Sequence, residues 1–305
     1  MIAGPPLTET DLPLELFARG KVRDTYVIGP DRLLMVATDR ISAFDHVLPN
    51  GIPDRGKVLT QLSIYWFSQT HSFQENHLVS GMVPDLPAEL RDRRDQLMGR
   101  FMIVRKAKRI DFECVVRGYL AGSAWKEYSE GQTLAGESMP PGLQESQRLA
   151  YPTFSPATKA ESGHDENITF TQLKKELGDE LATKLRDASI ELYKFASTLA
   201  ERRGLILADT KFEFGLIDDD LVLIDEALTP DSSRYWEAAT YQVGTSPQSY
   251  DKQFVRDWLL RSGWDKESDP PHLPEDIVAQ TRERYLTAYH RLVGKPLFPP
   301  KARNE

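Results

Sequence analysis

The side chains with the clearest chemistry alternate along one short segment, which reads LADTKFEFG. Side chains two residues apart in a β-strand share a face, so Asp209, Lys211 and Glu213 would point one way. The two phenylalanines between them would then point the other way, into the core. The segment therefore predicts a strand with a carboxylate, an ammonium and a second carboxylate along one face.

A further carboxylate is expected opposite Glu213. If Ile217 pairs with Leu221 around the three aspartates that separate them, the hairpin places Glu213 opposite Asp225. Two carboxylates in this position repel each other unless positive charge lies between them. Mg²⁺, which binds carboxylate and phosphate oxygens, is the natural candidate. A solvated edge with Lys211 as counter-charge is the alternative, and a slip of one residue would change the face.

Two basic residues near the chain start follow a glycine. Lys21 and Arg23 are two residues apart, and Gly20 lets the backbone approach a ligand closely. The pattern indicates a hairpin that holds the phosphate tail of a nucleotide, although it is not a Walker motif. A surface turn with two solvated cations is the alternative.

Two further groups of residues could bind anions. Arg117 at the end of a predicted strand and Ser123 at the cap of the next helix would bind a phosphate, or form only a salt bridge and a cap. Ser233 and Arg234 lie in a turn soon after Asp225 and could hold another phosphate or carboxylate. Together, these groups describe an ATP-using enzyme with a phosphorylated or multiply anionic substrate.

The composition narrows the class of protein. The 305 residues include 38 Lys plus Arg and 46 Asp plus Glu, and the net charge of −8 disfavours a nucleic-acid binder. No apolar run approaches the ~18 residues that span a membrane, and the acidic N-terminus does not resemble a signal peptide. A single cysteine, Cys114, excludes an internal disulfide and a cysteine zinc site. We expect a soluble cytoplasmic protein without nucleic-acid or membrane partners.

The elements that must position these residues form an α+β pattern. Strands are expected at residues 26–28, 32–37, 101–106, 112–120, 205–217 and 221–227. Helices are expected at 59–69, from a Thr169–Gln172 capping box to about 203, after Ser246–Pro247, and from Pro274 to 292. Residues 131–167 read as a long functional loop. The length and this order predict a strand-rich first lobe and a mixed second lobe.

Six segments of the chain resemble, in the same order, the SAICAR synthetase family, the ATP-dependent ligases of purine biosynthesis. They are residues 20–24, 38–45, 113–123, 164–167, 209–215 and 225–234. The resemblance covers about residues 19 to 260, and the runs at 113–123 and 209–215 are highly specific. A small-molecule kinase or a non-catalytic nucleotide-binding regulator would share only part of this pattern.

The resemblance implies a reaction in which ATP, L-aspartate and carboxyaminoimidazole ribonucleotide (CAIR) give SAICAR, ADP and phosphate. A carboxylate acylates poorly because its leaving group is oxide. Phosphoryl transfer from ATP makes an acyl phosphate, which the amine of aspartate then attacks. The protein mainly aligns the reactants and neutralises charge, with Mg²⁺ as cofactor.

The resemblance also implies a role for each candidate residue. The ATP phosphates would be held by Gly20, Lys21, Arg23 and Lys159, and Mg²⁺ by Glu213 and Asp225. The ribonucleotide would be held by Arg117, Ser123, Ser233, Arg234 and, on a closing loop, Asp165. The reacting centre would be lined by Asp45, Asp209 and Lys211.

The family fold implies a two-lobed plan like that of ATP-grasp enzymes and kinases, with ATP in the cleft. The N-terminal β-rich lobe would span residues 1–109 and the C-terminal α/β lobe residues 110–305. Residues 101–106 and the crossing near Arg109 would form the hinge beside adenine. Extra sequence around 131–149 and beyond 251 leaves both a monomer and a homodimer open.

Overall fold

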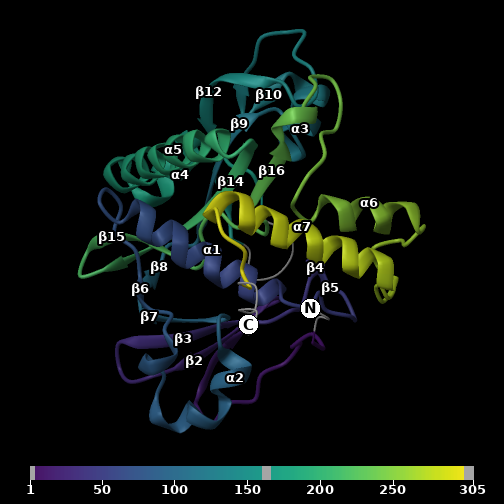
Figure 1. The fold of residues 1–305 in the computed structure, drawn as a ribbon. Coiled ribbons are helices and arrows are strands. Elements are labelled where there is room, and N and C mark those ends of the chain that lie inside the picture. The colour runs from purple at the N-terminus through teal and green to yellow at the C-terminus, as the bar shows by residue number, and fades with distance from the viewer. Residues whose placement is uncertain (1–3, 160–165, 299–305) are drawn as a thin grey trace.

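Two antiparallel β-sheets, flanked by helices, carry the residues of interest (Figure 1). The computed structural model describes residues 4–159 and 166–298. Strands between residues 16 and 105 form the first sheet, and strands between residues 108 and 237 form the second. The expected mixture of strands and helices is confirmed.

The first sheet has five strands in the order β1-β2-β3-β7-β6. Their bounds are Leu16–Arg19 (β1), Arg23–Val27 (β2), Arg32–Ala37 (β3), Leu78–Ser80 (β6) and Phe101–Arg105 (β7). One face of the sheet packs on short helices, η1 (Val83–Asp85), η2 (Ala88–Arg93) and α2 (Arg94–Leu97). The β1–β2 turn contains Gly20 and Lys21, which confirms the predicted glycine-bearing hairpin.

The second sheet is organised around β14 (Leu205–Ile217), the longest strand of the described residues. Its neighbours are β8 (Lys108–Arg109), β9 (Phe112–Tyr119), β15 (Asp220–Ile224) and β16 (Ser233–Glu237). Two further strands, β12 (Arg148–Phe154) and β13 (Ala157–Thr158), pair with β9. Phe212 and Phe214 are 0% exposed, so the predicted alternation of faces along β14 is confirmed.

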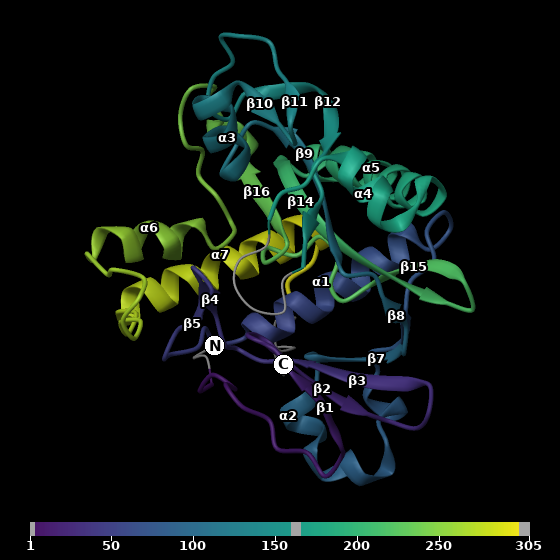
Figure 2. The ribbon, with the colours of Figure 1, turned by 180° about the vertical axis from the view of Figure 1, so that it is seen from behind.

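The larger helices lie on and between the sheets (Figures 1 and 2). They are α1 (Arg55–Thr70), α3 (Ser123–Gly131), α4 (Phe170–Leu177), α5 (Asp179–Arg202), α6 (Gln253–Arg261) and α7 (Glu275–Val293). The smaller elements are β4 (Ser42–Ala43), β5 (His46–Val47), β10 (Thr133–Leu134), β11 (Glu137–Ser138) and η3 (Ala238–Thr240). None of the described helices has the length and apolarity that crossing a membrane requires.

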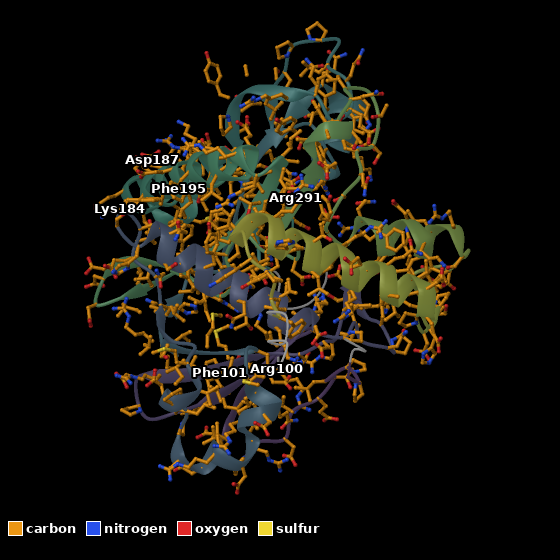
Figure 3. The ribbon with its side chains drawn as sticks, viewed as in Figure 1. Arg100, Phe101, Lys184, Asp187, Phe195 and Arg291 are labelled. Carbon is orange, nitrogen blue, oxygen red and sulfur yellow. The ribbon has the colours of Figure 1, made fainter. Side chains whose placement is uncertain are left out.

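Helix α1 packs on β3 and β7 of the first sheet and also joins the core of the second sheet, although it precedes that sheet in the chain. Its residues Leu59 and Trp66 share one buried cluster with Phe212 of β14 and Leu292 of α7. Helix α7 lies along α1, and Arg291 near its end pairs with Glu237 of β16 at 2.6 Å (Figure 3). Arg291 also donates to the carbonyl of Arg203 at the end of α5, and residues of α7 and α5 share the same buried cluster.

Three expectations for the elements need correction. The helical stripe that starts at the confirmed Thr169 capping box is broken at Gly178, whose φ of 84° ends α4 before α5 begins. No helix starts at Ser246–Pro247, because Ser249 forms a β-bridge with Trp236, and α6 begins only at Gln253. The expected loop at 131–167 contains strands β10 to β13 in its described part.

The expected register of the β14–β15 hairpin is wrong by one residue. Ile217 pairs with Asp220, so Glu213 lies opposite Ile224 and not opposite Asp225. The turn consists of Asp218 and Asp219 alone, with φ of 52° and 67°, as a two-residue type I′ turn requires. Asp225 follows the strand with φ of 63°, and its side chain still reaches the pocket that Glu213 lines.

Candidate active site

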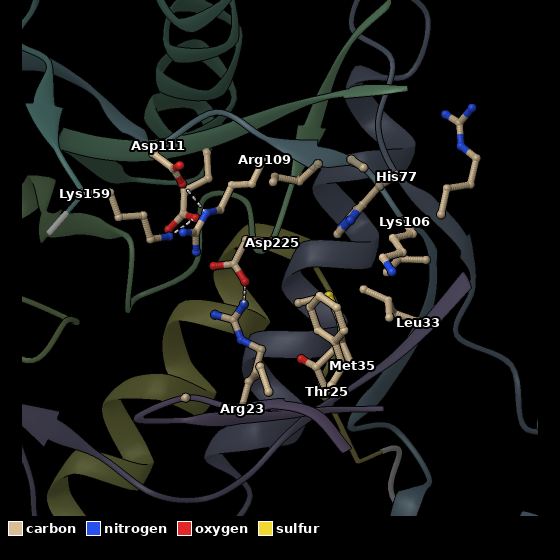
Figure 4. A pocket seen from close by; sticks show the side chains of 18 residues that line it. Arg23, Thr25, Leu33, Met35, His77, Lys106, Arg109, Asp111, Lys159 and Asp225 are labelled. Carbon is tan, nitrogen blue, oxygen red and sulfur yellow. Dashed lines mark hydrogen bonds and ion pairs between the residues drawn. The ribbon is translucent and has the colours of Figure 1, made fainter. Parts of the chain in front are cut away.

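A pocket of about 590 Å³ opens between the two sheets (Figure 4). One end of it is apolar and is lined by Leu33, Met35, Val104 and Ile224. Arg105, at the end of β7, and Lys106 and Ala107, which follow it, also line the pocket. This end suits a flat aromatic group that stacks between aliphatic side chains.

The other end of the pocket is strongly polar. Arg23 pairs with Asp225 and, at 3.0 Å, with Glu226, while Lys159 pairs with Glu213 (Figure 4). Burial disfavours the Arg23 cation, but the two carboxylates outweigh it and raise its pKa. Gly20 lines the same wall, so the structure brings together the predicted residues Gly20, Arg23, Lys159, Glu213 and Asp225.

Lys211 lies beside this polar end. Its ammonium pairs with Glu113 of β9 and lies 3.6 Å from Glu213 Oε1. Burial disfavours the charged form, but Glu213 and Glu113 outweigh it and raise the pKa of Lys211. Lys211 is therefore a permanent cation at neutral pH and is unsuited to act as a general base.

A second cluster lies farther along β14, at the start of α3. Asp209 Oδ2 accepts a hydrogen bond from Arg234 Nη1 at 2.5 Å and lies 3.7 Å from Arg117 Nη1. Arg117 Nη2 donates to Ser123 Oγ at 3.1 Å. The predicted anion-binding residues Arg117, Ser123 and Arg234 thus meet around Asp209.

Two details of this cluster differ from expectation. The N-cap of α3 is Gly122 rather than Ser123. Glycine is needed there, because a Cβ at position 122 would lie 2.6 Å from Arg234 Nη2. Ser233 is buried, and its hydroxyl lies 2.7 Å from that of Thr210. Since neighbouring strand residues alternate, the Ser233 side chain points away from the face that carries Arg234.

The remaining predicted residues lie apart from the pocket. Lys21 pairs with Asp45, and both side chains are about half exposed, at 51% and 48%. Lys21 and Arg23 therefore have different partners, although they lie two residues apart. Phe44 and Asp45 both have left-handed φ, of 49° and 65°, a strained backbone of the kind found at functional sites. Asp165 lies outside the described residues.

A model of the SAICAR synthetase family matches residues 16–271. The chain belongs to the SAICAR synthetase family. A phosphoribosylaminoimidazole-succinocarboxamide synthase from Syntrophobacter fumaroxidans is 52% identical, covering 97% of this chain and 99% of that protein. A phosphoribosylaminoimidazole-succinocarboxamide synthase from Thermodesulfovibrio yellowstonii is also 52% identical, covering 94% of this chain and 98% of that protein. The structure of a SAICAR synthase from Saccharomyces cerevisiae, complexed with SAICAR, matches with a TM-score of 0.87 and 44% sequence identity. The match covers 95% of this chain and 99% of that one.

The predicted resemblance is confirmed by these matches. As a member of the SAICAR synthetase family, the chain is a ligase that produces SAICAR in purine biosynthesis. Among the described residues, no group of three or more His, Cys, Asp and Glu side chains is arranged to hold a metal ion.

Two carboxylates of this SAICAR synthetase family member were missed as site residues in the sequence. Glu113 holds Lys211, and Glu226 holds Arg23. Burial raises the pKa of the Glu226 carboxyl, although the cation of Arg23 acts in the opposite direction. Each of the two lies at the edge of a recognisable motif. The signal that could have identified them is a charged residue in a strand segment that is otherwise expected to be buried.

Proposed function

We propose that this ligase binds ATP in the pocket between two lobes, and joins L-aspartate to CAIR through an acyl phosphate. The observation that supports this best is the layout of β14. Glu213 faces the pocket, Asp209 faces the arginine cluster, and Lys211 lies between them. One rigid strand therefore spans a site for ATP and a site for an anionic substrate, with a cation at their junction. The two-lobed plan would resemble that of ATP-grasp enzymes and kinases.

ATP fits the pocket in one direction. Adenine would occupy the apolar end, against Leu33 and Met35 and beside residues 105–107. The phosphates would then reach Arg23 and Lys159 at the polar end. Gly20 leaves room for them at the β1–β2 turn, and Lys21 would approach from the same turn.

The residues present fit a magnesium ion. Glu213 and Asp225 line the same pocket and offer carboxylate oxygens, the ligands that Mg²⁺ prefers together with phosphate and water. Both carboxylates are paired with cations, Lys159 and Arg23, which would exchange them for phosphate oxygens when ATP and metal bind. Bound there, Mg²⁺ would neutralise charge on the phosphates during transfer.

The ribonucleotide would bind through its phosphate at the second cluster. Arg117 and Arg234 offer guanidinium donors, and Ser123 offers a hydroxyl at the start of α3. Ser233 would support Arg234 from the buried face of β16. Asp165, outside the described residues, stays a predicted substrate residue.

The carboxylate of CAIR would then lie near Lys211. Its ammonium would stabilise negative charge on the carboxylate and on the transferred phosphoryl group, because it stays protonated at neutral pH. Asp209 and Asp45 are the carboxylates that we place around the incoming amine of aspartate. The protein thus supplies alignment and charge and needs no protein nucleophile.

An ADP-release assay with CAIR tests the proposal, run with and without L-aspartate. ADP release that requires aspartate is expected, whereas release without any amine would indicate a kinase. Arg234→Ala is expected to raise the KM for CAIR by at least about tenfold, since a charge-assisted bond to phosphate is lost. An unchanged KM for CAIR would remove Arg234 from the phosphate site.

A further inference from the structure

A buried ionic cluster lies where α1, α7 and the turn before β16 meet, and the mechanism above uses none of its members. At its centre is Asp231, which accepts hydrogen bonds from Tyr285 Oη at 3.0 Å and from Lys252 Nζ, 2.9 Å away. The guanidinium of Arg55 pairs with the same carboxylate. Arg55 and Tyr285 are each only 1% exposed.

Arg55 connects two distant parts of the chain. It starts α1, and its Nη1 donates to the backbone carbonyl of Arg40, while its guanidinium contacts Asp231. The guanidinium carbon lies 5.6 Å from the centroid of the Tyr285 ring. Burial costs a charged group much of its hydration, and this cost can cancel the attraction within a buried ion pair. The Arg55–Asp231 pair is therefore weak evidence of a role in stability alone.

Asp231 lies in the turn that positions Arg234 of the arginine cluster. Its turn also contains Ser232, whose carbonyl accepts a hydrogen bond from Lys211 N at 2.8 Å, and it leads directly into Arg234. Burial disfavours ionisation of Asp231, but Arg55 and Lys252 outweigh it and hold its pKa below the ordinary value. The carboxylate therefore stays charged and keeps its three partners.

We propose that Tyr285 and Arg55 are positioning residues for the ligase reaction, which hold Asp231 and through it set Arg234 for the phosphate of the ribonucleotide. This inference rests on the proposed phosphate-binding role of Arg234. Tyr285 comes from α7, which begins at residue 275, beyond the region 16–271 that the family model matches. The C-terminal helix thereby contributes to substrate binding without touching substrate.

Tyr285→Phe tests the inference because it removes one hydroxyl and keeps the ring. The KM for CAIR is expected to rise about fivefold, less than the loss of a direct hydrogen bond to a charged group would cause because Tyr285 acts through Asp231, with the KM for ATP unchanged. Tyr289→Phe is the matched control, since Tyr289 is buried on the same helix and no hydrogen bond of its hydroxyl is seen in the described residues. It should leave both KM values at wild type.

The Tyr285→Phe and Arg234→Ala results distinguish failure of this inference from failure of the proposed phosphate site on which it rests. A purely structural role would lower the fraction of active enzyme, and hence kcat, with both KM values unchanged, and that result for Tyr285→Phe overturns the inference. If Arg234→Ala also leaves the KM for CAIR unchanged, the proposed phosphate site fails instead. Arg55→Lys should bind CAIR better than Arg55→Met, and equal KM values for the two folded variants would remove Arg55. If the methionine variant does not fold, Tyr285→Phe decides.

Discussion

The stability of this ligase should fall as the pH drops from neutral to 5, and one histidine should account for much of the fall. His77 is 3% exposed, and its ring packs edge-on against Phe67 at 5.5 Å. Burial lowers the pKa of its imidazole to about 3, with smaller contributions from nearby cations, Arg23 among them. In the unfolded chain the same group would titrate near its ordinary value of about 6.5.

The sign and size of the effect follow from this difference. Between about pH 6.5 and pH 3 the unfolded chain binds a proton that the folded chain does not, so the free energy of unfolding decreases as the pH falls. Each pH unit below 6.5 costs about 1.4 kcal/mol, and at pH 5 the loss reaches roughly 2 kcal/mol. The loss is absent above about pH 7.

Urea unfolding from pH 8 to pH 5, without added metal, measures the effect. His77→Gln keeps a polar side chain of similar size but cannot take up the proton. Its free energy of unfolding should therefore depend less on pH, by about 2 kcal/mol at pH 5. His272→Gln, at an exposed position, is the control and should follow wild type. If wild type and His77→Gln lose stability in parallel, the burial argument for His77 is refuted.

Three further predictions concern the metal site, a close backbone approach and a helix cap. Glu213→Gln and Asp225→Asn should each lower the kcat of Mg²⁺-dependent ADP release at least about 100-fold with a native circular dichroism spectrum; full activity in both would contradict the metal site. Gly118→Ala should lose about 2 kcal/mol in urea unfolding, because the added Cβ would lie 1.8 Å from Tyr193 Oη, and wild-type stability would show that the ring moves freely. Thr169→Ala removes the side-chain half of a capping box, the hydroxyl that accepts from Gln172 N, and should cost about 1 kcal/mol, or roughly 1–2 °C in Tm for a chain of this length, whereas an unchanged Tm would mean that this bond is dispensable.

Features set by neighbouring residues were predictable from the sequence. The alternation of Asp209, Lys211 and Glu213 with two phenylalanines follows from strand geometry alone, and burial of the phenylalanines selects the face. The capping box at Thr169 is equally local, since its two members are three residues apart. Both predictions needed no knowledge of the rest of the chain.

Features set by distant residues were not predictable in the same way. The β14–β15 register depends on whether two or three residues form the turn, and three successive aspartates allow either. The partner of Lys211 is Glu113, almost a hundred residues away, which only the pairing of β9 with β14 brings near. Lys21 and Arg23 separate because the β1–β2 turn aims Lys21 at Asp45. These outcomes are decided by tertiary packing rather than by spacing.

The position of α1 in the core also affects how the chain folds during its synthesis. Translation completes α1 early, but other members of the buried cluster of Leu59 and Trp66, including Phe212 and Leu292, are synthesised much later. Until then α1 can pack on β3 and β7, but it lacks the second sheet and α7, which complete its buried cluster. A nascent chain in this state is prone to aggregate. The α1 segment is therefore where a chaperone would be expected to hold the growing chain, until α7 leaves the ribosome and folding can be completed.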